Sequence, residues 1–234
     1  MSSYTNKDLR KNINQSLGLS ENLKDDKLDE SYVAQQKQFN LSTELLSRAN
    51  KNNHIELYHQ YVKDFNKISA ELDAVDKKLA GSNSSNFRSL KIDETYNLNA
   101  IYLHELYFAN ISDIHSEISM DSLSYMRLAR DFGSFDEWQE DFIACCTAGR
   151  CGWAITYFNT YLKSYVNCFV DLHSMNVPIG AYPIVVMDTW QHAYYRDYLK
   201  DIKTYTYGMM KQLNWNVVES RFEKAEKIAK ALRG

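Results

Sequence analysis

A carboxylate and an imidazole lie four residues apart in this chain, at Asp188 and His192, where an apolar run gives way to a helical pattern. One turn of helix, or a tight bend from strand to helix, brings residues at this spacing together. The pair suits a first-row transition metal, although an ion pair or a helix cap would also explain the spacing. Because a carboxylate that ends an apolar strand is poorly hydrated, it needs a partner. We therefore predict that Asp188 and His192 supply half of a mononuclear metal site.

Two further histidines, His54 and His104, lie in helical patterns that are rich in aromatic residues. A single histidine on an apolar helix face is usually a core residue with a hydrogen-bond partner, so each of the two is either a ligand or a core histidine. His59 points away from the face of His54, and His115 lies in a polar connection. We expect the latter two to be solvated.

The composition excludes several classes of protein. The 234 residues are 44% hydrophobic and carry a formal net charge of −3 with no long basic run, whereas nucleic-acid binders need clustered Lys and Arg. The longest apolar stretch, residues 184–187, is far too short to cross a bilayer, and the polar first fifteen residues lack a secretion signal. Four cysteines without a CxxC pair are typical of reduced thiols. We expect a cytoplasmic protein without nucleic-acid or membrane partners.

The first part of the chain is predicted to be helical. Residues 1–40 are polar and form an N-terminal extension with a helix around residues 24–38. Residues 42–44, Ser-Thr-Glu, have the pattern of a capping box in which Ser or Thr opens a helix. We assign residues 41–120 to a long α-helical hairpin domain.

Apolar periodicity locates the two helices of this hairpin. The first runs over residues 53–79, and another runs from about 94 to 111, beyond a Gly- and Ser-rich break at 81–86. The predicted apolar face of the first consists of Leu57, Tyr61, Ile68, Leu72, Val75 and Leu79.

The period changes in the second part, residues 121–234. A helix capped by Ser134 precedes three segments rich in β-branched and aromatic residues, which we predict to be strands. Helices resume at Trp190 and are interrupted near residues 214–215. The expected class is therefore α+β, with a helical hairpin followed by a three-stranded antiparallel sheet surrounded by helices.

Seven fragments, taken in order over roughly residues 40–230, resemble the iron/manganese superoxide dismutase family. The first two hold the helical histidines, and the sixth holds the Asp188–His192 segment. The fragments are HIELYHQYV, YLHELYF, GSFDEWQEDF, RCGWAI, HSMNVPIG, PIVVMDTWQHAYYRDY and LNWNVVESRF.

The resemblance implies a fold, an activity and a set of site residues. One iron or manganese ion per subunit, with alternating oxidation states, would convert superoxide to dioxygen and hydrogen peroxide, and the protein would be a homodimer. Tyr61 would be the hydroxyl at the substrate channel, although a gapless count of the family pattern places this tyrosine one residue later. His173 would bond the metal-bound water from a loop, unless it is an ordinary surface histidine. The implied metal ligands are His54, His104, Asp188 and His192.

Several positions differ from the family pattern. Gln191 replaces a Glu that crosses the dimer interface, and Tyr58 replaces a His that we expect to meet Tyr195 of a neighbouring subunit. Phe108 replaces a Trp, and Leu103 replaces an Asn. None of these changes removes a ligand, but they leave activity open.

Two alternatives to the enzyme therefore remain. One is a superoxide dismutase-like structural or assembly protein with little activity, joined to a partner through residues 1–40. The other is a mononuclear non-haem iron oxygenase with two His and one carboxylate. The additional histidine in register counts against the oxygenase.

Overall fold

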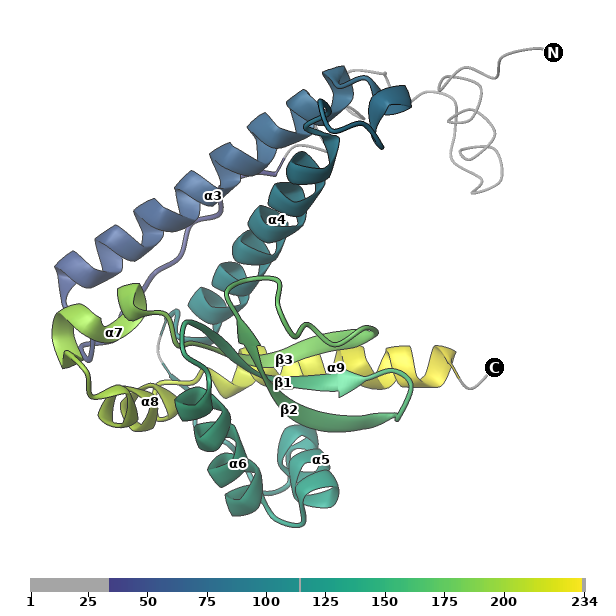
Figure 1. Cartoon of the computed structure of the whole chain (residues 1–234). Helices are drawn as coiled ribbons and strands as arrows, with labels where there is room; N and C mark the ends of the chain where they lie inside the picture. Colours follow the sequence, from purple (N-terminus) through teal and green to yellow (C-terminus); the bar gives the residue numbers. More distant parts are fainter. Residues whose placement is uncertain (1–33, 114, 233–234) are drawn as a thin grey trace, which may run out of the picture. The chain divides into compact units, whose positions relative to one another are not determined.

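Two long helices, α3 (Arg48–Ala74) and α4 (Phe87–Asn110), pack against each other in the first half of the chain (Figure 1). This computed structural model describes residues 34–113 and 115–232. The predicted extension lies outside the described residues as far as residue 33. The helix predicted around 24–38 is wrong over residues 34–38, which form no helix, and its remainder lies outside the described part.

The start of α3 differs from the capping-box prediction. Thr43 Oγ1 accepts from the Leu45 backbone N–H at 3.2 Å, so this hydroxyl closes a local turn instead of opening a helix. The cap is Ser47, whose Oγ accepts from the Asn50 N–H at 3.2 Å. The predicted start at residues 42–44 is therefore wrong by about one turn.

The other helix boundaries also differ from the periodic pattern. Helix α3 ends at Ala74, and a separate 3₁₀ turn, η1 (Lys77–Leu79), follows. The predicted break at residues 81–86 is confirmed, but α4 begins directly after it at Phe87 rather than near residue 94.

The buried face of α3 agrees with the predicted one only in part: Leu72 is buried as expected, but the other buried residues of this helix are not the predicted ones. Residues Asn50, His54, Tyr58 and Val62 are buried at four-residue spacing, whereas Leu79 is 52% exposed. A count of aliphatic residues finds a helix but misplaces its buried side where polar and aromatic residues line a site.

The second half holds the sheet and its covering helices. Strand β1 is central in the order β2-β1-β3, and both of its pairings are antiparallel. The predicted α+β class, the three strands and the Ser134 cap are confirmed. The elements are α5 (Leu123–Phe132), α6 (Phe135–Ala148), β1 (Gly152–Asn159), β2 (Ser164–Asp171), β3 (Ala181–Asp188), α7 (Gln191–Tyr198), α8 (Ile202–Met210) and α9 (Trp215–Ala231).

Helices of both halves of the chain pack on the sheet. Helix α6 packs on β1 and β2, where Trp138 Nε1 donates to Thr156 Oγ1 at 2.8 Å, while α4 and α9 pack on β3. The predicted interruption near residues 214–215 is confirmed, and a second one lies at Leu199, where φ is +50°.

All of these elements belong to one compact unit, Gln36–Gly234. The boundary at residue 120 between a hairpin domain and a C-terminal α/β domain stays a prediction. No helix among the described residues combines the length and apolar character needed to span a membrane.

Candidate metal centre

Four side chains from four different elements converge at one point, where α3 and α4 meet β3 and α7. His54 comes from α3, His104 from α4, Asp188 from the last position of β3 and His192 from the first turn of α7. Their potential ligand atoms all lie within 4.8 Å of one another. The first three side chains are at most 1% exposed, and that of His192 is 25% exposed. The structure thus brings together all four residues that the resemblance implies.

The Asp188 carboxylate is the centre of this cluster. Its Oδ2 lies 3.1 Å from His54 Nε2, 3.2 Å from His192 Nε2 and 3.8 Å from His104 Nε2. Its Oδ1 instead accepts from the Trp190 backbone N–H at 2.8 Å. The backbone at the start of α7 therefore takes one carboxylate oxygen and directs the other toward the three imidazoles.

His104 shows that the site fits a metal ion. Its Nδ1 lies 2.6 Å from the Ala100 carbonyl oxygen, which can only accept, so Nδ1 carries the proton. The lone pair of Nε2 is therefore directed into the cluster, and this buried atom has no hydrogen-bond partner among the described residues. A buried acceptor without a donor is costly unless a cation binds it.

Burial and charge set the protonation of the donor set. Burial lowers the pKa of His54 and of His104, so both imidazoles are neutral. Burial alone would raise the pKa of Asp188, but attraction to His192 and the hydrogen bonds from His192 and His54 hold it well below its usual range. Three imidazoles and one ionised carboxylate suit iron or manganese.

The start of α3 is tied to α7. Asp197 Oδ2 accepts from the Ser47 backbone N–H at 2.9 Å and from Asn50 Nδ2 at 3.0 Å, and Asn50 Nδ2 also donates to the Ala193 carbonyl at 3.0 Å. Asn50 lies one turn before His54, and Ala193 follows His192. These bonds therefore fix two proposed ligands relative to each other.

A buried arginine joins α4 to β3. Asn110 Nδ2 donates to the Val186 carbonyl at 2.8 Å, and Arg221 of α9 donates to Asn110 Oδ1 at 2.5 Å. Arg221 also donates to the carbonyls of Ile184 at 2.7 Å and Leu106 at 3.0 Å. The helix of His104 is thus held to the strand of Asp188.

His173 is fully buried beside the cluster, so the alternative of a surface loop histidine is wrong. Trp153 Nε1 donates to His173 Nδ1 at 3.0 Å. Because an indole N–H only donates, the proton of the neutral ring is on Nε2, which then donates to Tyr61 Oη at 3.0 Å. Burial lowers the pKa of His173 to about 4, which keeps the ring neutral.

Tyr61 reaches this network from the neighbouring face of α3. Its ring centroid is 5.4 Å from that of His104, and its hydroxyl hydrogen-bonds to Tyr96. Burial raises its pKa. The position one residue later is Val62, an apolar side chain that is 3% exposed. Tyr61, and not its neighbour, therefore lies beside His173.

Two of the residues that differ from the family pattern, Phe108 and Tyr58, lie beside His54 between α3 and α4. Phe108 is fully buried with its ring centroid 4.9 Å from that of His54. Tyr58 is also fully buried, and its hydroxyl lies 3.0 Å from both the Lys37 backbone N and Glu105 Oε1. The expectation that Tyr58 meets a tyrosine of a neighbouring subunit does not agree with this enclosure by its own chain.

Some residues around the site escaped the sequence prediction. Glu105 and Tyr96 both take part in hydrogen bonds beside it, and the one signal for Glu105 was an acidic residue within the apolar segment YLHELYF. The expected solvation of His59 is only partly correct, because its Nε2 is buried and has no partner in the described part of the chain. His115 is exposed, as expected.

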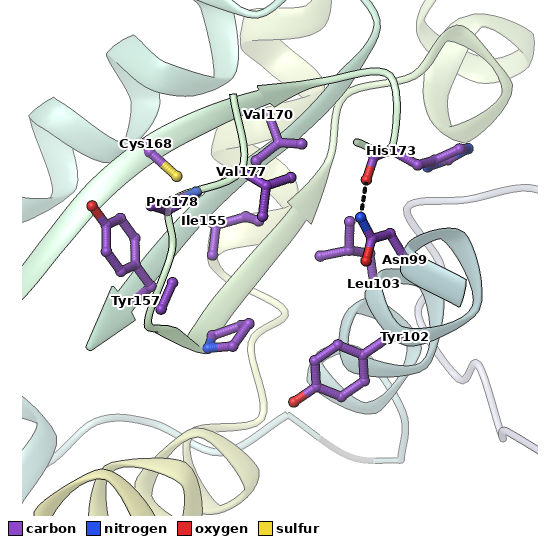
Figure 2. Close-up of a pocket in the computed structure, with 12 residues that line it drawn as sticks. Asn99, Tyr102, Leu103, Ile155, Tyr157, Cys168, Val170, His173, Val177 and Pro178 are labelled. Atoms are coloured by element: carbon purple, nitrogen blue, oxygen red, sulfur yellow. Dashed lines mark hydrogen bonds between the residues drawn. The ribbon is translucent and has the colours of Figure 1, made fainter. Parts of the chain in front are cut away.

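An apolar cavity of about 180 Å³ lies beside the centre, between α4, the sheet and the loop after β2 (Figure 2). Asn99 Nδ2 donates to the His173 backbone carbonyl at 2.8 Å at the edge of this cavity, and the His173 ring points away from it. The cavity therefore lies on the opposite side of the loop from the His173 ring.

Comparison with known proteins gives a consistent result. Residues 122–221 match the model of the C-terminal domain of iron/manganese superoxide dismutases. "Superoxide dismutase [Fe]" of Aquifex aeolicus is 34% identical over 179 residues, which cover 75% of this chain and 83% of that protein. "Superoxide dismutase [Mn] 1" of Halobacterium salinarum is 30% identical over 173 residues, which cover 74% and 84%. "Superoxide dismutase [Fe]" of Cupriavidus metallidurans is 30% identical over 187 residues, which cover 79% and 90%.

Proposed function

The chain belongs to the iron/manganese superoxide dismutase family, and on that basis we propose that it catalyses the metal-dependent dismutation of superoxide to dioxygen and hydrogen peroxide. The observation that carries the proposal is the convergence of three imidazoles and one carboxylate within 4.8 Å in the interior of the protein. The proposed ligands of one iron or manganese ion are His54, His104, Asp188 and His192.

The bound ion would supply one-electron redox chemistry. The protein supplies an enclosure for it. The side chains of His54, His104 and Asp188 are at most 1% exposed, so solvent reaches the cluster chiefly beside His192. Phe108 and Trp153, both fully buried, place apolar rings around the imidazoles and lower the local dielectric.

Dismutation to hydrogen peroxide consumes protons, and the chain holds hydroxyl and imidazole protons beside the cluster. We assign this role to His173 and Tyr61. Trp153 fixes the His173 tautomer, which places a proton on Nε2 at 3.0 Å from Tyr61 Oη. Tyr61 Oη also hydrogen-bonds to Tyr96, so His173, Tyr61 and Tyr96 form a chain of groups that can exchange protons beside the cluster.

A paired measurement tests this proposal. Purified protein is analysed for bound metal, and superoxide consumption is assayed after reconstitution with iron and with manganese separately. We expect about one ion per chain and activity with at least one metal. An apo protein that stays inactive after reconstitution with both would overturn the proposal. Tyr61→Phe is the matched variant, with metal content retained and turnover reduced.

We also propose a homodimer that forms through α7. Gln191 and Tyr195 are both exposed on this helix, and Tyr195 is 53% exposed. Gln191→Glu would add a charge able to strengthen a hydrogen bond to an imidazole across the interface. Tighter dimers at dilute concentration are expected in sedimentation, and an unchanged mass would count against this interface. We further propose a cytoplasmic location, which the free cysteines support, and an antioxidant role, which follows from the proposed activity.

A further inference from the structure

A closed ring of hydrogen bonds lies next to the proposed ligands. Tyr58 Oη accepts from the Lys37 backbone N–H at 3.0 Å and donates to Glu105 Oε1 at 3.0 Å. Lys37 Nζ donates to Glu105 Oε2 at 2.5 Å and completes the ring. Each of the three residues therefore contacts the other two.

We propose that this ring is a clamp that sets the spacing of α3 and α4 and thereby retains the metal ion, with Glu105 as its central positioning residue. The inference rests on the proposed function, because it assumes that His54 and His104 are ligands.

The place of the ring in the fold supports this role. Tyr58 lies one helical turn after His54 on α3, and Glu105 follows His104 directly on α4. The bond between Tyr58 and Glu105 thus crosses from one helix to the other at the level of the two imidazoles. A change in this spacing would move the Nε2 atoms of His54 and His104 relative to each other.

Phe39, in the segment before α3, packs against the side chains next to this hydrogen-bonded ring. The Phe39 ring lies 5.3 Å from the Phe108 ring and 6.0 Å from the Tyr58 ring, centroid to centroid. Phe108 in turn contacts His54 at 4.9 Å. The side chain of Lys37 is 63% exposed, whereas that of Glu105 is 14% exposed. The hydrogen-bonded ring of Lys37, Tyr58 and Glu105 therefore lies between solvent and the site. Breaking it would expose the side chains that pack against His54.

The carboxylate chemistry of Glu105 is essential to this clamp. A carboxylate accepts with both oxygens, here from a phenol and from an ammonium, and such charge-assisted bonds are short and strong. An amide has only one acceptor oxygen, so Glu105→Gln breaks at least one side of the ring without changing the size of the side chain.

The test compares Glu105→Gln with Glu94→Gln, a matched control. Glu94 pairs with Lys91 on the same helix, but the pair lies away from the site. Each metal-loaded protein is mixed with excess chelator below its unfolding temperature, and metal release is followed with time. We expect release from Glu105→Gln to be about tenfold faster, as for other groups that orient ligands, and release from Glu94→Gln to match the wild type.

Further variants separate positioning from loss of fold. Tyr58→Phe and Lys37→Met should also accelerate metal release. Lys37→Arg, which keeps the positive charge, should release metal at the wild-type rate. The unfolding midpoint of each apo protein is measured alongside, because a purely structural role would lower it without a selective effect on release. Release at the wild-type rate from both Glu105→Gln and Tyr58→Phe would overturn the clamp. Absence of metal from the wild type would instead refute the proposed function.

Discussion

The two halves of the proposed metal centre are built in different ways. His54 lies near the start of the long helix α3 and His104 toward the end of α4, and side chains of other elements hold these helices in place, such as Asp197 at α3 and Arg221 at α4. Asp188 lies at the end of a strand four residues before His192, and the backbone N–H of Trp190 orients its carboxylate. The helical half, His54 and His104, therefore depends on tertiary contacts. The strand half, Asp188 and His192, is set largely by its local chain.

This difference explains what each half requires. The strand half can place its carboxylate wherever β3 and the start of α7 are formed. The helical half reaches its place only when α3, α4 and α7 are docked. His54 and Asp188 are 134 residues apart in the sequence, so only the tertiary fold brings them together. Changes in the strand half should therefore act on the metal directly, whereas changes around the helices should act through their docking.

Asp188→Asn should have the largest effect. Its Oδ2 contacts two imidazoles within 3.2 Å and the third at 3.8 Å, and a neutral amide is a much weaker ligand. We expect no stoichiometric metal and no measurable superoxide consumption, by metal analysis and activity assay. A variant that retains full metal would show that the strand half is not the centre of the site.

His104→Ala tests the helical half. We expect metal content to fall to about a tenth of the wild type or less, while the helical signal in circular dichroism stays largely intact because α4 remains docked. Unchanged metal content would refute the assignment of His104 as a ligand. A greater loss than in Asp188→Asn would reverse the ranking of the two halves.

Arg221→Met addresses the connection between the halves. This arginine is 5% exposed and donates to Asn110 and to the carbonyls of Ile184 and Leu106. Loss of these buried bonds should lower the free energy of unfolding by about 2–4 kcal/mol, measured by chemical denaturation of the apo protein. A drop below about 0.5 kcal/mol would mean that α4 is held to β3 mainly by apolar packing.

Glu226→Gln should have the smallest effect, because it lies away from both halves. The hydrogen bond from Arg127 lowers the pKa of Glu226 in the folded protein below its ordinary value of 4.5. The pair therefore contributes stability above that value, and the contribution is lost as the pH falls through the folded pKa. We expect a loss of at most about 1 kcal/mol at pH 7, which shrinks as the pH falls through the folded pKa of Glu226. A change in metal content would contradict the separation of this region from the site.

The sequence predicted the local features better than the docked ones. The three strands and the Ser134 cap follow from patterns within a few residues, and the spacing of Asp188 and His192 needs no tertiary knowledge. Thr43 misled the prediction of the first helix, because its hydroxyl closes a turn instead. The interruption at Leu199 was missed, since a positive φ at a leucine has no signal in a single sequence.

The helical half of the site could be found only through resemblance. Nothing in the spacing of His54 and His104 indicates that the two side chains meet, because their approach depends on how α3 and α4 dock. The same reason explains why Glu105 was overlooked. Its partners, Lys37 and Tyr58, lie 68 and 47 residues away.

The wide separation of the ligands also has a consequence for biosynthesis. A ribosome exposes the chain from its N-terminus, so the histidines of α3 and α4 emerge well before Asp188 and His192. Until then the nascent chain offers two imidazoles but no carboxylate from this cluster. Capture of a metal ion by all four proposed ligands must therefore wait until His192 has been synthesised, and the complete set can select between iron and manganese only after that point.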